Sequence, residues 1–482
     1  MTRLRLLLLT FILLSWSAAA TLHAASGAGG PRTMKFPPLS YEIPGAERIV
    51  LDCGMPVYLL QDRELPIISI TAMVHTGSVY DPPRLAGLAA MTGSVMRSGG
   101  AGGAAPEAID DELEYMASSV ESGIGPDMGT VSMTSLTKNF PATLRIFSNV
   151  LLRPDFDGKR VDLARKHAVE GIRRRNDDPK EIAGREIVRA IYAGHPLGMV
   201  PEVETVTAVT REEMTAFHRR YFRVDNMVLA VSGSFERDRL LKELNAVFGS
   251  VRPAEPLSVM PIPQPGRRPG TEVMYGRKAV SQSVIRMGHL GISKDDPDLY
   301  AIRLLDYILG GSFTSRLTME IRTNRGLAYS VGSHFDIGRS VAGSFIAETE
   351  TKAGTTAQAV GLMKEIITGV TREPVTEQEL ALAKEYILNS FMFGFTSAAS
   401  IVTQRARLEY YGYPADYLEK YRDNISRVTR EGLLAAARRH LKPDSFKLVV
   451  IGDADGFDRP LAEFGPVREL DPGRKPEAGK GQ

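Results

Sequence analysis

The chain has 482 residues, of which 43% are hydrophobic, and it carries 59 Lys and Arg against 57 Asp and Glu. Its net charge of +2 excludes the basic surplus that is typical of proteins binding nucleic acid or anionic membrane surfaces. Cys53 is the single cysteine, which excludes an intrachain disulfide and a thiolate metal cluster.

Residues 1–25 have the pattern of a secretory signal peptide. Arg3 and Arg5 precede an apolar run over 6–14, and small residues follow at 18–20. The run is shorter than the ~20 residues that a membrane span needs, so we expect cleavage and no membrane anchor. The predicted location is the periplasm, with full secretion as the alternative. The mature chain then has 57 basic and 57 acidic residues, because two arginines leave with the signal.

Strands and helices are mixed throughout residues 40–250. Two apolar runs at 48–52 and 57–62 flank a turn at Gly54, which predicts a hairpin, and a strand over 67–74 follows. Apolar periodicity predicts helices over 85–97, 106–119, 139–152, 158–175 and 179–192, with a strand over 130–136.

Six prolines within residues 251–270 predict a stiff extended linker, because proline interrupts both helices and central strands. The second half, 271–465, repeats the scheme of the first. We predict strands over 272–275 and 282–289, and helices over 297–309 and 314–323. The tail, 466–482, is rich in charge, Pro and Gly and is predicted to be disordered.

An internal repeat relates the two halves. Residues 209–233 and 428–452 align without a gap, with eleven identities in 25 positions. Each copy predicts a Thr-capped helix, a short link and an apolar strand ending at Gly. The chain is therefore predicted to hold two homologous α+β domains, each a mostly antiparallel sheet packed with helices.

Several short stretches occur together in one order. In the first half they are 76–81 (TGSVYD), 87–100 (GLAAMTGSVMRSGG), 151–156 (LLRPDF) and 194–198 (GHPLG); in the second, 295–317 and 326–331 (GLAYSV). With this order and spacing, the chain resembles the insulinase/pitrilysin family of inverted-zincin peptidases over nearly all its mature length. The resemblance implies two homologous domains that form one half of a clamshell. It also implies that a half-length member works in a pair.

Active members of that family carry His-x-x-Glu-His on the helix that corresponds to 85–97. Two histidines, four residues apart, bind zinc, and the glutamate is the general base. Here Ala90 and Ser94 occupy the histidine positions and Gly93 occupies the glutamate position. The family's third ligand corresponds to Gly171, eight residues before Pro179. We therefore expect no metal in this chain; His167, four residues before Gly171, is the one histidine considered as a replacement ligand.

A second family signature is complete. Gly310, Gly311 and Ser312 begin a stretch that leads to Arg322 and Tyr329, seven residues apart. In the family, this Arg and Tyr reach substrate at the zinc site. A phenol can donate to an oxyanion, and a guanidinium can hold substrate carbonyls. The alternative is structural: Arg322 caps its helix and Tyr329 belongs to the core.

Three functions remain open at this stage. The first is a non-catalytic subunit of a heterodimeric periplasmic zinc peptidase, in which a homologous partner carries the zinc and this chain binds the peptide through Arg322, Tyr329 and the Gly310–Ser312 segment. The second is a non-enzymatic peptide-binding or scaffold protein that forms a homodimer. The third is a self-sufficient metallopeptidase with rearranged ligands that include His167.

Overall fold

The structure, a computed structural model, describes residues 45–252, 257 and 261–471. The predicted signal peptide, most of the predicted tail and part of the proline-rich linker lie outside these residues. Positions 261–269 of the linker form neither helix nor strand, as the prolines predict.

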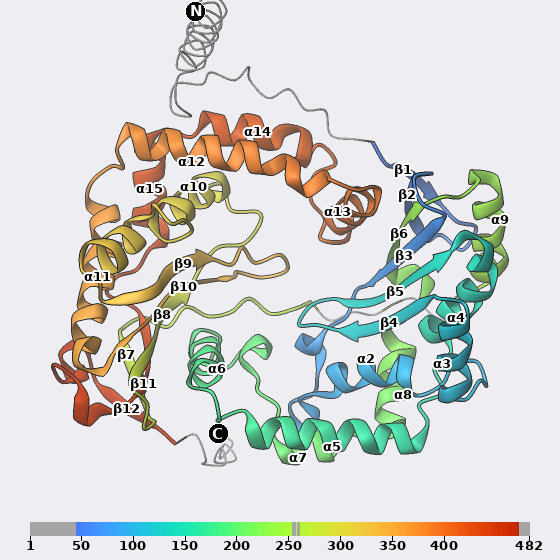
Figure 1. The fold of residues 1–482 in the computed structure, drawn as a ribbon, viewed down its shortest axis with the longest axis horizontal. Coiled ribbons are helices and arrows are strands. Elements are labelled where there is room, and N and C mark those ends of the chain that lie inside the picture. Colours follow the sequence, from blue (N-terminus) through green and yellow to red (C-terminus); the bar gives the residue numbers. More distant parts are fainter. Residues whose placement is uncertain (1–44, 253–256, 258–260, 472–482) are drawn as a thin grey trace, which may run out of the picture. The chain divides into compact units, whose positions relative to one another are not determined.

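The first sheet has six strands in the order β1-β2-β6-β3-β5-β4 (Figure 1). Their bounds are β1 (Glu47–Val50), β2 (Pro56–Gln61), β3 (Ile67–Val74), β4 (Ser119–Ile124), β5 (Gly129–Leu136) and β6 (Met227–Gly233). The β2–β6 pair is parallel and the other four pairs are antiparallel. The predicted hairpin and the predicted strands at 67–74 and 130–136 are confirmed.

Strand β4 corrects one prediction. The helix expected over 106–119 ends at Tyr115, because Ala117 has a left-handed φ of 47° and Ser118 N closes the helix end on Leu113 O at 2.9 Å. The chain then returns along β5 as the edge strand β4.

The second sheet has the order β12-β7-β11-β8-β10-β9. Its strands are β7 (Glu272–Arg277), β8 (Gln282–Leu290), β9 (Ala328–Phe335), β10 (Ser344–Lys352), β11 (Lys447–Gly452) and β12 (Val467–Leu470). Strand β12 lies within the tail that was predicted to be disordered. That prediction is wrong over 467–470, because these residues pair in parallel with β7.

The internal repeat occupies matching places in the two sheets. Thr210 and Thr429 cap α8 (Arg211–Tyr221) and α15 (Arg430–His440) through side-chain hydrogen bonds of 3.2 and 3.1 Å. The strands that follow, β6 and β11, each pair with one parallel and one antiparallel neighbour. This arrangement makes β4 and β9 equivalent edge strands.

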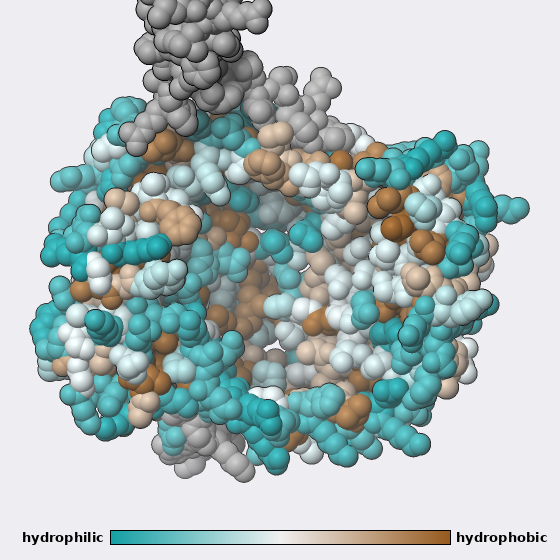
Figure 2. Space-filling model, in the orientation of Figure 1, coloured by the Kyte–Doolittle hydropathy of each residue, from teal (hydrophilic) through white to brown (hydrophobic). Residues whose placement is uncertain are grey.

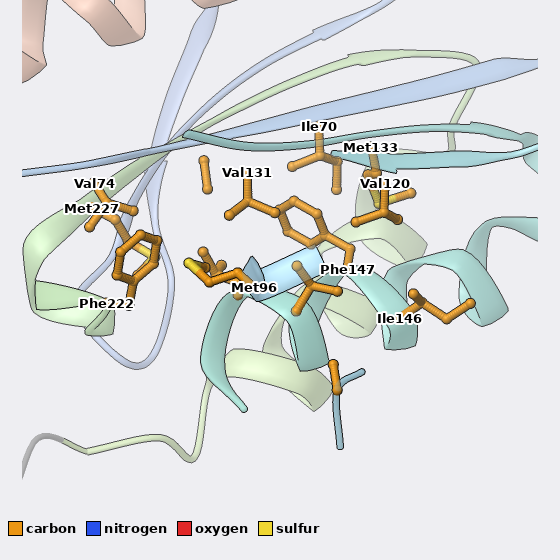
Figure 3. Close-up of a cluster of buried hydrophobic side chains, with 14 of the residues drawn as sticks. Ile70, Val74, Met96, Val120, Val131, Met133, Ile146, Phe147, Phe222 and Met227 are labelled. Atoms are coloured by element: carbon orange, nitrogen blue, oxygen red, sulfur yellow. The ribbon is translucent and has the colours of Figure 1, made fainter. Parts of the chain in front are cut away.

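Helices pack on both sheets, so the fold is α+β as predicted. The remaining helices are α2 (Leu88–Ser98), α3 (Pro106–Tyr115), α4 (Phe140–Leu152), α5 (Gly158–Arg174), α6 (Pro179–Ile191), α7 (Val203–Thr207), α9 (Arg237–Phe248), α10 (Leu299–Leu309), α11 (Thr356–Arg372), α12 (Glu377–Ser390), α13 (Ala398–Tyr410) and α14 (Tyr417–Arg427). Figure 3 shows part of the first core, where Met96 of α2 and Phe147 of α4 point toward Val131 and Ile70 of the sheet.

Two helices pack against the sheet that belongs to the other half of the sequence. Ile182, Ile187 and Ile191 of α6 are buried with residues of β7, β8 and β11. In turn, Val402, Ala406 and Tyr410 of α13 are buried against β3 and β6. Hydrophilic side chains cover most of the face seen in Figure 2, with apolar ones in small patches.

No single helix in the described residues is long and apolar enough to cross a membrane. One pair bent by 107°, residues 377–395 with 398–410, passes by length and composition alone. Val402, Ala406 and Tyr410 of α13, in that pair, are buried against the first sheet.

Candidate functional site

Helix α2 carries three of the four positions at which the family places its zinc chemistry. A buried carboxylate fixes the start of this helix. Asp81 Oδ2 and Oδ1 accept hydrogen bonds from Gly87 N and Ala89 N, both at 2.9 Å. Burial raises the pKa of Asp81 to about 6 even though these bonds favour the ionised form.

Ala90 and Ser94 occupy one exposed face of α2, as their spacing of four residues predicts. Alanine offers no ligand atom, and a neutral serine hydroxyl is a poor zinc ligand beside imidazole or carboxylate. This face of the helix is therefore accessible but has no metal-binding chemistry.

Gly93, at the glutamate position, is buried against β4. Ser122 Oγ donates a hydrogen bond of 2.6 Å to Gly93 O, which ties the helix to the strand. A Cβ at Gly93 would lie 2.5 Å from Ile124 N and 2.8 Å from Gly123 C. Backbone atoms cannot yield as a flexible side chain can, so the strand fills the space that a glutamate side chain would need.

Helix α5 does not supply a metal site either. Gly171 is exposed, and a Cβ there would meet open space. His167 is exposed one turn earlier, and Glu170 is paired with Arg174 at 2.7 Å. The side chains at these positions do not fit a zinc ion, and in the described residues no group of three ligand atoms gathers around His167.

One group of three possible ligands does occur in the described part of the chain, at Asp296, Asp298 and His440. Both carboxylate oxygens of Asp298 already accept hydrogen bonds from Arg439, at 2.6 and 2.7 Å. His440 Nε2 lies 2.8 Å from Asp298 Oδ2. The Arg439 hydrogen bonds lower the pKa of Asp298. This cluster joins the C-terminal end of α15 to the start of α10 and is an ion-pair network.

The second predicted site is a cavity of about 670 Å³ in the second half of the chain. All five residues that the sequence assigned to substrate binding line it: Gly310, Gly311, Ser312, Arg322 and Tyr329. The lining side chains all come from residues 307–386, so α2 and α5 take no part in it. We call it the Arg322 cavity.

Arg322 and Tyr329 are brought together by a short helix and a turn. The segment Thr318–Asn324 is a π-helix, and Gly326 follows with a left-handed φ of 62°, which lets β9 begin at Ala328. Arg322 Cζ lies 5.1 Å from the centroid of the Tyr329 ring. Tyr329 is 85% exposed, so the alternative that it belongs to the core is excluded.

Phe313 completes this arrangement and was not predicted as a site residue. Its ring is 79% exposed, and its centroid lies 5.4 Å from Arg322 Cζ. The guanidinium thus contacts two exposed aromatic faces and forms no ion pair among the described residues. Phe313 follows the Gly310–Ser312 segment directly, and this position could have identified it as a site residue from the sequence.

The two glycines are required by close packing. A Cβ at Gly310 would lie 2.1 Å from Ser333 N of β9, and one at Gly311 would lie 3.1 Å from Asp306 O. Asp306 in turn holds the far end of β9, because its Oδ1 accepts a hydrogen bond of 2.9 Å from Phe335 N. Burial raises the pKa of Asp306 to about 7.

Tyr307 and Tyr386 also line the cavity, as a stacked pair with ring centroids 4.6 Å apart. Neither was predicted as a site residue: Tyr307 lies on α10, within the stretch 295–317, and Tyr386 lies on α12, outside the stretches that carried the resemblance. With Phe313 and Tyr329, they give the cavity four aromatic side chains around Arg322, a cation with no ion pair in the described part of the chain. Such a lining can bind an extended peptide through its carbonyls and apolar side chains.

Comparison with known proteins identifies relatives along most of the chain. Residues 57–200 match the sequence model "Insulinase (Peptidase family M16)", and residues 208–387 match "Peptidase M16 inactive domain". An uncharacterized zinc protease of Mycobacterium leprae is 29% identical over 286 residues, which is 58% of this chain and 64% of that relative, less than two thirds of its length. A Helicobacter pylori protein named non-peptidase homolog YmxG is 21% identical and is matched over 83% of this chain and 92% of its own length.

A solved structure has the same fold. The peptidase M16 inactive domain from Pseudomonas fluorescens superposes with a TM-score of 0.77 and 26% identity, covering 85% of this chain and 98% of that one. The two family segments together contain the stretches that carried the resemblance and the strands from β3 to β10. The chain belongs to the insulinase family of peptidases, family M16, and is of its half-length type.

Proposed function

We propose that this chain is the non-catalytic subunit of a heterodimeric zinc peptidase in the periplasm. In the pair, a homologous subunit with an intact His-x-x-Glu-His motif carries the zinc and activates water. This chain contributes the Arg322 cavity, which holds the peptide. The observation that carries the proposal is the contrast between an open Arg322 cavity and a glutamate position at Gly93 that backbone atoms fill.

Within this proposal, Arg322 and Tyr329 have separate roles. The guanidinium of Arg322 donates to carbonyl oxygens of the peptide and fixes its register. The phenol of Tyr329 donates to the oxygen on which negative charge develops during hydrolysis. Phe313 and Tyr386 offer ring surface to apolar side chains of the same peptide.

The first experiment measures activation of the partner. The chain purified alone is expected to bind no stoichiometric zinc and to cleave no peptide. Added to a homologue with the intact motif, it should raise the rate of cleavage of a quenched fluorescent peptide. Tyr329→Phe should lower the activated rate at least about tenfold, because an oxyanion donor is removed.

Tyr115→Phe is the matched control, since Tyr115 is 93% exposed on α3 and lies outside the cavity. It should activate as the unchanged chain does. Full activation by Tyr329→Phe would refute the role of that phenol, and failure of any intact-motif homologue to be activated would refute the pairing.

A peptide-binding protein that takes no part in hydrolysis is the second candidate. The name of the Helicobacter pylori relative, a non-peptidase homolog, favours it. It predicts a homodimer that binds peptide in the Arg322 cavity, with no gain in turnover for any added homologue. Sedimentation of the purified chain, alone and with its candidate partner, separates the two proposals.

A further inference from the structure

A second cavity, of about 790 Å³, has no role in the function proposed above. Three arginines line it: Arg303 on α10, Arg339 between β9 and β10, and Arg407 on α13. Four tyrosines line it as well, Tyr411, Tyr413, Tyr417 and Tyr421. We call it the arginine–tyrosine cavity. Its lining shares no residue with that of the Arg322 cavity.

The three arginines lack the carboxylate partners that many other arginines of the described residues have. Arg316, for example, forms a two-pronged pair with Glu379 at 2.7 and 2.8 Å. None of the three cavity arginines forms an ion pair with a carboxylate of the described residues. Arg303 is the most enclosed of them, and its Nε is buried without a hydrogen-bond partner. An enclosed cation with unused donors is costly unless an anion approaches it.

Tyrosine rings hold two of these guanidinium groups in place. Arg303 Cζ lies 5.7 Å from the centroid of the Tyr421 ring, and Arg339 Cζ lies 5.0 Å from that of Tyr411. The donors are therefore oriented before any ligand binds, which lowers the entropic cost of binding.

Nearby carboxylates do not cancel the positive charge. Asp336 is the one acidic side chain in the lining. Asp306 lies one turn from Arg303 on α10, but its carboxylate accepts from Phe335 N, and its raised pKa of about 7 leaves it only partly ionised at neutral pH. Asp127 accepts a hydrogen bond of 3.1 Å from the Tyr411 hydroxyl. The lining itself has three cations and one anion.

The tyrosines determine which anion fits. The Tyr411 hydroxyl already donates to Asp127, whereas burial raises the pKa of Tyr417, so the Tyr417 phenol stays protonated and can donate. Phenol donors, guanidinium groups and broad ring faces suit a single carboxylate within an apolar or aromatic segment. A phosphate dianion would bring more charge close to Asp336 and would leave the ring faces unused.

Strand β9 connects the two cavities. Tyr329, near its start, lines the Arg322 cavity, and Phe335, at its end, lines the arginine–tyrosine cavity. Six residues of extended chain separate these positions, which is about 20 Å. A peptide held beside Tyr329 can therefore reach the second cavity with a residue about six positions away.

We infer that the arginine–tyrosine cavity binds a carboxylate-bearing segment of a peptide, as a second anchor for the peptide held in the Arg322 cavity. The inference rests on the proposed function, because it takes the ligand to be a peptide. It narrows the substrate class to peptides that carry an acidic residue about six positions from the one beside Tyr329.

The experiment measures binding by this chain alone, so that the result does not depend on the partner. The probe is a fluorescein-labelled twelve-residue peptide with two adjacent glutamates, compared by anisotropy with its glutamine twin. The glutamate peptide should bind about tenfold more tightly, as expected for one charge-assisted contact. The double variant Arg339→Gln/Arg407→Gln should remove this preference, and both of these residues are exposed enough for the fold to be retained.

Two controls keep the result specific. Lys166→Gln/Arg173→Gln removes the same charge from the exposed surface of α5 and should keep the preference. Arg322→Gln should weaken the binding of both peptides by the same factor and should also keep the preference for the glutamate peptide. Equal binding of the two peptides, or a preference that survives the cavity double variant, would overturn the inference. Competition by inorganic phosphate at lower concentration than by acetate would overturn the carboxylate assignment.

Discussion

The equivalent edge strands β4 and β9 have opposite surroundings. Along β4, Gly93 brings α2 against the strand backbone, and Ser122 bonds directly to the helix. Along β9, the corresponding helix α10 ends at the Gly310–Gly311 pair, and the residues that follow line the Arg322 cavity. A double glycine follows each helix, at 99–100 and at 310–311. The equivalent residue six positions before it is Gly93 in the first half and Leu304 in the second.

This difference shows that two copies of one fold can pack differently at equivalent strands. The side chain of Leu304 is buried in the core of the second half. Gly93 has no side chain, and this lets α2 contact the backbone of β4 directly. In the first half, the helix at the position of the metal site has become part of the packing. In the second, two aromatic side chains remain exposed, Phe313 at 79% and Tyr329 at 85%, beside the half-buried Arg322. Burial of such groups would be expected if they had only a structural role.

The largest predicted effect tests whether the first site is closed. Gly93→Glu should destabilise the protein by roughly 3 kcal/mol or more, because its Cβ would overlap Ile124 N and force the helix from the strand. Gly171→Glu, at the position of the family's third ligand, meets open space and should destabilise the protein by less than about 0.5 kcal/mol. Urea unfolding measures both variants.

Equal stability of these two variants would contradict the close contact between α2 and β4. The two variants also separate two explanations. If the first half had only lost its zinc-binding side chains, it would accept glutamate at both positions. Here one position is open and the other is filled by backbone.

A smaller effect is expected at the glycine pair of the second half. Gly310→Ala should cost roughly 2 kcal/mol, because the added Cβ would lie 2.1 Å from Ser333 N. Gly311→Ala, whose closest contact would be 3.1 Å, should cost less. Thermal melting gives the order of the two, and the reverse order would show that the loop does not rest on β9 as described.

Much of this contrast could be foreseen from the sequence. The gapless repeat predicted two equivalent domains, and Ala90, Ser94 and Gly171 showed at once that ligand atoms were missing. The resemblance to the family also identified Arg322 and Tyr329, which line one cavity. These predictions needed only side-chain identities, their periodicity and the order of short stretches that the family shares.

Other features depend on contacts between distant residues. The closure at Gly93 requires β4, a strand that was not predicted; the expected helix over 106–119 ran too far because a left-handed Ala117 has no strong local signal. Tyr386 reaches the Arg322 cavity from α12, and Arg303 meets Tyr421 across more than a hundred residues. Strand β12 was missed because pairing with β7 outweighs a composition typical of disorder.

The smallest predicted effect concerns the buried carboxylate that anchors β9 between the two cavities. The pKa of Asp306, about 7 in the folded chain, lies above the ~3.9 of an unfolded aspartate. The folded state therefore holds the proton more tightly, and the free energy of unfolding falls as pH rises from about 4 to 7. Asn cannot ionise, yet its side-chain oxygen can still accept from Phe335 N. Between pH 5.5 and 7.5 the unchanged chain should lose on the order of 1 kcal/mol more than Asp306→Asn, because partial contact with solvent reduces the full effect. Urea midpoints at the two pH values measure this difference, and a constant gap between the two proteins would show that Asp306 is ionised throughout and that β9 is held in some other way.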